Sequence, residues 1–287
     1  MSYQVVTNLE QALAALKNGA EKSRIIAGGT DLFLEKLPEN LLDVSSLSEA
    51  LVIEERGSDL LIGAAVTHAR AVASPLLCKK ARALTEACAQ VGSPQVRNIG
   101  TLGGNVINAA PAADAAVALA ALGAKAELLD CNGNTRIVEL EELYAGFNCS
   151  AIDSCQELLL RFIVHIGGPG SGTAFTRLAA RKALALPMAN VAAWVRVADN
   201  RLREVRLVVA PVKPAPTRLF KTEALLAGKP LATESWREAA QAAMEEVEVR
   251  GSLLRCSADY RRHLVGVLVG RVLETAAGRA LTGKGEA

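Results

Sequence analysis

Two glycine pairs flanked by polar side chains are the residues of this sequence best suited to ligand binding. One pair lies in RNIGTLGGN at residues 97–105, and the other in RIIAGGTDL at residues 24–32. Glycine lacks a Cβ, so its backbone can approach a ligand closely and can adopt positive φ without strain. Successive N–H groups in such a loop bind anions, and threonine hydroxyls and asparagine amides add hydrogen bonds. The two loops therefore predict the two ends of one phosphorylated ligand, a dinucleotide.

Each glycine pair taken alone is more often an ordinary turn than a binding loop. Neither motif fits GxGxxG or GxxxxGK[ST], so neither the Rossmann nor the P-loop pattern applies.

Read together with their flanks, the two motifs resemble the FAD-binding subunit of the molybdenum hydroxylases, the family of xanthine dehydrogenase and carbon monoxide dehydrogenase. The resemblance rests on AGGTDL near the amino terminus and on VRNIGTLGGNVINAAPAAD about seventy residues later. It continues in GAAVTHARAVASPLL, in FTRLAARKALALPMANVAAWV and in VRGSLLRCSADYRRHLVGVLVGRVL. It therefore extends over nearly the whole chain, from about residue 3 to residue 277.

The resemblance implies that this chain binds FAD through both motifs. Backbone N–H groups of residues 28–31 would donate to the pyrophosphate, and residues 101–105 would hold the other side of the cofactor. Asp114 matches an acidic residue near the ribityl chain, and the backbone of Leu159 matches a position that lines the flavin. The predicted cofactor-binding residues are Ile25, Ile26, Ala27, Gly28, Gly29, Thr30, Asp31, Leu32, Thr101, Leu102, Gly103, Gly104, Asn105, Asp114, Leu159 and Thr176. No metal ligand and no catalytic side chain is expected, because the redox chemistry belongs to the flavin.

Three of these residues have a second interpretation. Asp31 is also typical of a helix cap or turn. Asp114 fits the first turn of a helix, where a carboxylate interacts well with the helix dipole. Leu159 is equally consistent with a plain core leucine.

The chain departs from the family pattern at two places. Some members stack an aromatic side chain on the flavin just before the second motif, where this chain has Val91. Some use a lysine in the carboxy-terminal domain, where this chain offers Thr176 and Arg177. Arg177, Arg181 and Lys182 could place positive charge near the flavin or the phosphate. The alternative for these three is a solvated basic strand edge.

The elements that position these residues follow from hydrophobic periodicity and from turn residues. Helices are expected at 9–17, 79–90, 111–123, 218–227, 233–248 and 258–277. Strands are expected at 24–27, on both sides of 57–59, at 124–130, 135–140, 157–166, 173–180, 190–197 and 202–210. The second glycine motif is expected to be a loop.

This order predicts an α+β fold. The run GGPGSG at 167–172 is the clearest boundary between domains. The resemblance implies a PCMH-type FAD-binding fold in two subdomains, residues 1–55 and 56–168. A carboxy-terminal domain, residues 173–287, would then combine a three-stranded antiparallel sheet with helices.

Composition narrows the class of protein. The 287 residues are 51% hydrophobic, enough to bury the cores of two domains of ordinary size. Aromatic residues make up only 3%, which argues against a stacking platform for nucleic acid. The balance of 32 basic and 30 acidic residues gives no general attraction to nucleic acid or to an anionic membrane. Without a signal peptide or a long apolar run, a cytoplasmic protein is expected.

The cysteines and histidines do not have metal-site spacing. No two cysteines form a CxxC pair, and no histidine is paired with a cysteine at zinc spacing. Reduced thiols packed as small apolar groups are therefore expected. The cysteines are Cys78, Cys88, Cys131, Cys149, Cys155 and Cys256, and the histidines are His68, His165 and His263.

The resemblance also implies partners. A large subunit would carry molybdopterin and the substrate, and a small subunit would carry two [2Fe-2S] clusters. This chain would be the FAD-carrying subunit that takes electrons from those clusters and passes them to NAD⁺ or another acceptor. Two alternatives remain open: a stand-alone flavin reductase of the same fold, and a nucleotide-binding scaffold module without redox activity.

Overall fold

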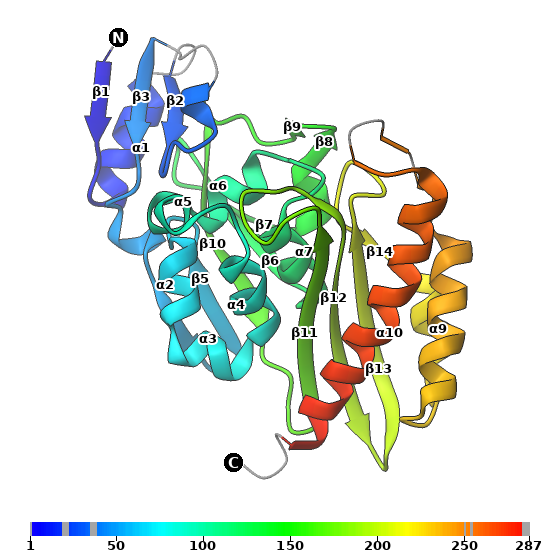
Figure 1. The fold of residues 1–287 in the computed structure, drawn as a ribbon. Coiled ribbons are helices and arrows are strands. Elements are labelled where there is room, and N and C mark those ends of the chain that lie inside the picture. Colours follow the sequence, from blue (N-terminus) through cyan, green and yellow to red (C-terminus); the bar gives the residue numbers. More distant parts are fainter. Residues whose placement is uncertain (1, 19–22, 35–38, 250, 253–254, 283–287) are drawn as a thin grey trace.

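The computed structural model describes residues 2–18, 23–34, 39–249, 251–252 and 255–282. Three larger sheets, each with its own helices, follow one another along the chain, and a two-stranded sheet accompanies them (Figure 1). The first is a three-stranded parallel sheet in the order β1-β3-β2, formed by Ser2–Val5, Asn40–Asp43 and Ser23–Ile26. Helix α1, Leu9–Asn18, packs on it through Ala12 and Leu16. Short 3₁₀ turns, Leu32–Leu34 and Ser48–Ala50, follow β2 and β3.

The second sheet is antiparallel and has the order β4-β5-β10-β6-β7. Its strands are Ile53–Arg56, Asp59–Gly63, Glu157–His165, Lys125–Asp130 and Thr135–Glu139. Six helices accompany this sheet: α2 His68–Ala73, α3 Pro75–Lys80, α4 Arg82–Ala89, α5 Pro94–Ile99, α6 Leu102–Ile107 and α7 Asp114–Ala121. A 3₁₀ turn, Leu140–Leu143, leads into the hairpin of β8 Tyr144–Gly146 and β9 Cys149–Ser150.

The third sheet is antiparallel and has the order β11-β12-β13-β14. Its strands are Ser171–Ala179, Pro187–Ala198, Arg201–Ala210 and Thr217–Arg218. Three helices follow: α8 Phe220–Leu226, α9 Thr233–Glu246 and α10 Ala258–Thr282. The sheet is covered on both faces, which explains the unbroken apolar run in β12. Val191, Ala193 and Val195 pack towards α9 and α10, whereas Ala192 and Trp194 join the core of the second sheet.

Helix α7 is the element that joins the second and third sheets. All eight of its residues are buried, and it contacts α4 on one side and β12 and β13 on the other. Its alanine side chains are small enough for close packing on both sides. The first residue of α7, Asp114, is therefore enclosed where the two sheets meet.

The α+β class and most of the expected elements are confirmed, and the following differences concern their bounds and the sheets. The expected helix 79–90 is two helices that meet at the buried Ala81. The helix expected from Pro111 begins at Asp114, because Ala113 still has extended backbone angles. The expected three-stranded sheet has a short fourth strand, β14. Strand β4 lies across the expected boundary between residues 55 and 56 and pairs within the second sheet.

Candidate functional site

The two glycine motifs lie directly against each other. Gly28 packs so closely on the turn before the second motif that a Cβ there would lie 2.7 Å from the carbonyl carbon of Ile99 and 2.9 Å from the Cα of Gly100. A side-chain hydrogen bond joins the same two segments, from Asn108 Nδ2 to Asp31 Oδ2 at 3.1 Å. The fold thus brings together two segments that are about seventy residues apart in sequence.

The first motif, at the end of β2, has unused hydrogen-bond donors. Gly29 has a positive φ of 65°, which turns the chain sharply after the strand. Its carbonyl accepts from the amide of Phe33 at 3.1 Å. Within the part of the chain that the structure describes, the backbone N–H groups of residues 28–31 donate to no oxygen. Four adjacent free amides form a site of the kind that binds a phosphate group.

The second motif has a different structure from the expected loop. Residues Leu102–Ile107 form the short helix α6, and Thr101 caps it by accepting the amide of Gly104 on Oγ1 at 3.1 Å. The amides of residues 102, 103 and 105 donate to Val66, Ala64 and Thr101 carbonyls at 2.8–3.0 Å. The expectation that successive N–H groups of this motif bind an anion is therefore wrong, because the protein uses them itself.

The two glycines of the second motif have different roles. A Cβ on Gly103 would lie 2.8 Å from both Cβ and O of Ala64, so this glycine allows two protein segments to pack together. Gly104 is exposed, and a Cβ there would meet only Thr101 Oγ1 at 3.0 Å. Beside it, Oδ1 of Asn105 is enclosed and has no hydrogen-bond partner. Enclosed polar atoms are rarely left unpaired. Gly104 is thus the glycine of this motif that is open to a ligand, and Asn105 beside it has an unused acceptor.

Asp114 is held by two side chains of the third sheet. It forms an ion pair with Arg177, and its Oδ1 accepts from Asn190 Nδ2 at 2.7 Å. Arg177 and Asn190 are cross-strand partners on β11 and β12. Burial raises the pKa of Asp114 from 3.8 to about 6, partly offset by the Arg177 charge and the Asn190 hydrogen bond. Arg177 is only 5% exposed, so the solvated-edge alternative is wrong for it.

The remaining expected residues are spread around this centre. Ile26 is buried in β2, and the side chain of Leu159 packs in the core of the second sheet, as a plain core leucine would. Thr176 is half-buried on β11. Arg181 and Lys182 are exposed, and the Arg181 guanidinium donates to the Leu184 carbonyl.

His68 is a further residue of this region, and the sequence alone did not single it out. It follows β5 and begins α2, and its backbone N–H donates to the carbonyl of Gly100 at 3.0 Å. The bridge between Thr67 and Thr101 continues this antiparallel contact. The segment GAAVTHAR is therefore the support on which the second motif rests. The only sign of this support in the sequence was that GAAVTHAR lies in a segment that resembles the family.

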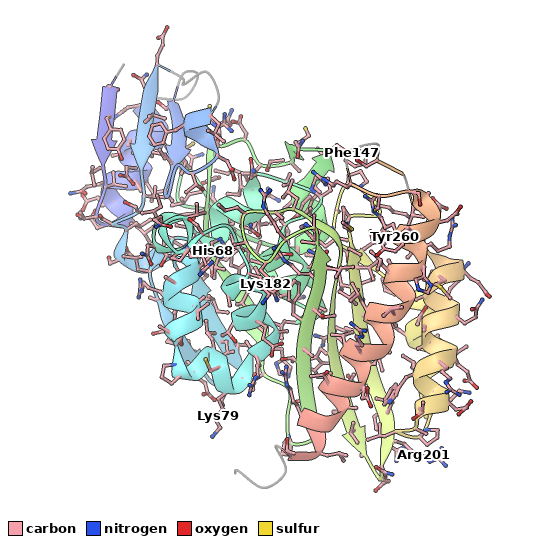
Figure 2. All side chains as sticks on the ribbon, in the orientation of Figure 1. His68, Lys79, Phe147, Lys182, Arg201 and Tyr260 are labelled. Carbon is pink, nitrogen blue, oxygen red and sulfur yellow. The ribbon has the colours of Figure 1, made fainter. Side chains whose placement is uncertain are left out.

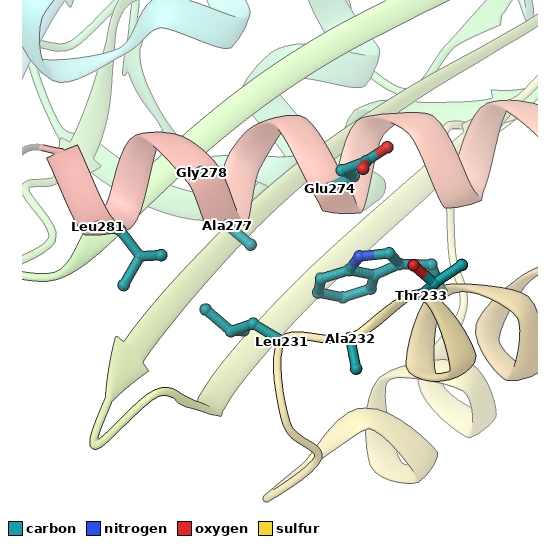
Figure 3. A pocket seen from close by; sticks show the side chains of 8 residues that line it. Leu231, Ala232, Thr233, Glu274, Ala277, Gly278 and Leu281 are labelled. Atoms are coloured by element: carbon teal, nitrogen blue, oxygen red, sulfur yellow. The ribbon is translucent and has the colours of Figure 1, made fainter.

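A cavity outside this centre contains neither glycine motif. It measures about 450 Å³ and is formed between the start of α9 and the end of α10 (Figure 3). Its lining contains Trp236 and Glu274 but no residue of either glycine motif. Among the described residues, no group of three His, Cys, Asp or Glu side chains is placed to hold a metal ion. No helix in the same part of the chain has the length and apolar character needed to cross a membrane.

Comparisons with known proteins agree with this geometry. Residues 1–164 match the family described as the FAD binding domain in molybdopterin dehydrogenase, and residues 174–276 match the CO dehydrogenase flavoprotein C-terminal domain. The chain is 30% identical to the carbon monoxide dehydrogenase medium chain of Afipia carboxidovorans, over 97% of both chains. It is 26% identical to the xanthine dehydrogenase FAD-binding subunit of Escherichia coli O157:H7, again over 97% of both.

Solved structures show the same fold. A chain of the reconstituted CO dehydrogenase from Oligotropha carboxidovorans superposes with a TM-score of 0.89 at 27% identity, covering 97% of this chain and 98% of that one. A chain of quinoline 2-oxidoreductase from Pseudomonas putida 86 gives a TM-score of 0.88 at 28% identity, covering 98% of both. The chain thus belongs to the family of FAD-binding subunits of xanthine and carbon monoxide dehydrogenase-type molybdenum hydroxylases, and it is a subunit of an FAD-dependent oxidoreductase.

Proposed function

We propose that this chain binds FAD between its two glycine motifs and acts as the electron-transfer subunit of a molybdenum hydroxylase. It would accept electrons from the [2Fe-2S] clusters of a small partner subunit and pass them to NAD⁺ or another acceptor. The observation that carries the proposal is the pair of motifs in direct contact, one of which has four free backbone amides.

The residues at this centre suit the parts of FAD. The free amides of residues 28–31 are donors for the pyrophosphate, which needs no lysine when several backbone N–H groups converge. Gly104 leaves the approach to α6 open, and the enclosed Oδ1 of Asn105 offers an acceptor to a hydroxyl or N–H group of the cofactor. A carboxylate accepts about four hydrogen bonds, and Asp114 uses two, so it can still accept from ribityl hydroxyls. The bound flavin would supply one- and two-electron chemistry.

The other expected contacts remain part of the proposal. Leu159 belongs to it through a backbone position expected to line the flavin, and Thr176 belongs to it through its place where some family members use a lysine. We also propose a division into three parts, with the first boundary moved from 55/56 to the residues before β4 and the other boundaries kept at 168 and 173. A cytoplasmic location and assembly with a large molybdopterin subunit complete the proposal. The relatives support assembly, since they are described as a medium chain and as an FAD-binding subunit.

The first test is the visible spectrum of the purified chain before and after incubation with FAD. A flavin spectrum that persists through gel filtration is the expected result. A colourless protein after reconstitution would contradict binding by the isolated chain. The same titration after co-expression with the two candidate partner subunits then separates a scaffold without flavin from a subunit that binds FAD only when assembled.

A second experiment tests electron transfer and the acceptor. The chemically reduced, FAD-loaded chain is mixed with NAD⁺, with a quinone and with oxygen, and reoxidation is followed at the flavin absorption band. Fast reoxidation by NAD⁺, but not by the quinone or by oxygen, supports NAD⁺ as the electron acceptor. Turnover of an added small-molecule substrate without any partner subunit would instead favour the stand-alone reductase.

A further inference from the structure

His68 lies between the core of the second sheet and the two glycine motifs. It is only 2% exposed, at the start of α2 (Figure 2). Its Nδ1 lies 3.4 Å from Sγ of Cys88, a fully buried residue of α4. The opposite edge of the ring faces the motifs. Cδ2 lies 3.5 Å from the point where a Cβ of Gly100 would be, and the hydroxyl of Thr30 lies 3.7 Å from the same point. The imidazole thus borders the contact between the two motifs.

The second ring nitrogen of His68 is free. Nε2, bonded to Cδ2, donates to and accepts from none of the described residues. It is also absent from the set of fully enclosed polar atoms without a partner, so it is not completely enclosed. The adjacent Cδ2 places this nitrogen on the edge of the ring that borders Gly100.

The contact with Cys88 determines which nitrogen carries the proton. Burial, assisted by the positive charge of Arg97, lowers the pKa of His68 to about 4, so the ring is neutral near pH 7. Burial raises the pKa of the Cys88 thiol, so the thiol keeps its hydrogen. An imidazole nitrogen is a good acceptor, whereas sulfur is a weak one. The favourable pairing is therefore S–H donating to Nδ1, which leaves the proton of His68 on Nε2.

We propose that His68 is a further cofactor-binding residue, whose Nε2–H donates a hydrogen bond to the pyrophosphate of FAD beside the free amides of the first motif. Cys88 acts as a positioning residue that fixes the donor tautomer. The proposal rests on the proposed FAD site. It adds one side-chain donor to a site otherwise made of backbone N–H groups, next to the positive charge of Arg97.

The test compares nucleotide affinity in matched variants of the full chain. His68→Leu removes both ring nitrogens at similar volume, and His68→Gln keeps an N–H donor at nearly the same reach. Binding of FAD and of ADP is measured by calorimetry. His68→Leu is expected to weaken both ligands by about tenfold or more, the factor for one hydrogen bond to a charged group. His68→Gln is expected to stay within about threefold of wild type.

His165 provides the control, since it is exposed and lies at the end of β10 with Asp59 as its partner. His165→Leu should leave both affinities unchanged. Equal FAD affinity in wild type and His68→Leu would overturn the proposal. A loss for FAD without a loss for ADP would also overturn it, because the contact would then be to the flavin side. Failure of the wild-type chain to bind FAD would instead contradict the proposed function itself.

A measurement without mutation keeps the proposal testable if His68→Leu does not fold. The chain has three histidines, so the imidazole nitrogens can be resolved by ¹⁵N–¹H NMR of the wild-type protein. The expected result is the Nε2–H tautomer for His68 and a shift of its Nε2 resonance when FAD binds. An Nδ1–H tautomer, or a resonance that FAD leaves unchanged, would overturn the assignment.

Discussion

Alanine in place of either glycine of the second motif should separate packing from ligand approach. A Cβ on Gly103 would lie 2.8 Å from Cβ and O of Ala64, and 3.2 Å from its carbonyl carbon. Real Cβ contacts are longer, so α6 or the segment before α2 must move. Overpacking of this kind costs about 1–3 kcal/mol, and weakening the 2.8 Å hydrogen bond from Gly103 N to Ala64 O adds about 1 kcal/mol. The expected loss of unfolding free energy is therefore about 2–4 kcal/mol.

Gly104→Ala is the matched control. Gly104 is exposed in a helix, where alanine is favoured by about 0.5–1 kcal/mol. Its Cβ would meet only Thr101 Oγ1, at 3.0 Å, a tight contact that offsets this gain. The unfolding free energy of the apoprotein should thus stay within about 1 kcal/mol of wild type. FAD affinity should nevertheless fall by about tenfold or more, or about 1.4 kcal/mol, because the methyl group points to the opening beside Asn105.

The assay combines two measurements on each variant. Urea denaturation of the apoprotein gives the unfolding free energy, and quenching of flavin fluorescence gives the dissociation constant for FAD. The reasoning predicts that Gly103→Ala changes mainly the first quantity and Gly104→Ala mainly the second. A Gly104→Ala variant that binds FAD as tightly as wild type would refute the placement of the cofactor on α6. A Gly103→Ala variant of full stability would refute the packing argument.

Four further changes test the surroundings of the site. Arg177→Met leaves the buried Asp114 carboxylate without its counter-charge. The unfolding free energy from urea denaturation should fall by about 3–5 kcal/mol at pH 7. The loss should be smaller at pH 5, where Asp114 is protonated. In the wild type, the raised pKa of Asp114 stabilises the apoprotein below about pH 4, and this contribution is lost as the pH rises through about 6. Asp114→Asn should remove this pH dependence of the unfolding free energy. The same pH dependence in the variant would contradict the raised pKa of Asp114. Glu86→Gln breaks the ion pair with Arg279 that joins α4 to α10, with an expected loss of about 1–2 kcal/mol in the same assay. Thr101→Val removes the N-cap of α6; a loss of about 1 kcal/mol is expected, and full stability would show that α6 does not need the cap.

The fold class was predictable from local sequence, and the two motifs expected to form the site could be recognised there. Apolar runs bounded by turn residues predict the three strands β11, β12 and β13, because such runs fit a buried pleated sheet whatever the partner strand is. The glycine pairs marked both halves of the site, since few other residues permit such close backbone approach. The helix starts at residues 79 and 111 were misplaced because Ala81 and Ala113 carry no local sign of their non-helical backbone angles.

The distribution of hydrogen-bond donors and charges was decided by the tertiary structure. The sequence predicts that the two glycine motifs bind one ligand, but the two motifs have similar residues, so it does not distinguish their roles. Only the packed chain shows that Ala64 and Val66 occupy the amides of the second motif and leave those of the first motif free. Likewise, Asp114 meets Arg177 and Asn190 across 63 and 76 residues of chain. The physical reason is that free amides and buried ion pairs depend on which distant segments come into contact, and local sequence does not encode those contacts.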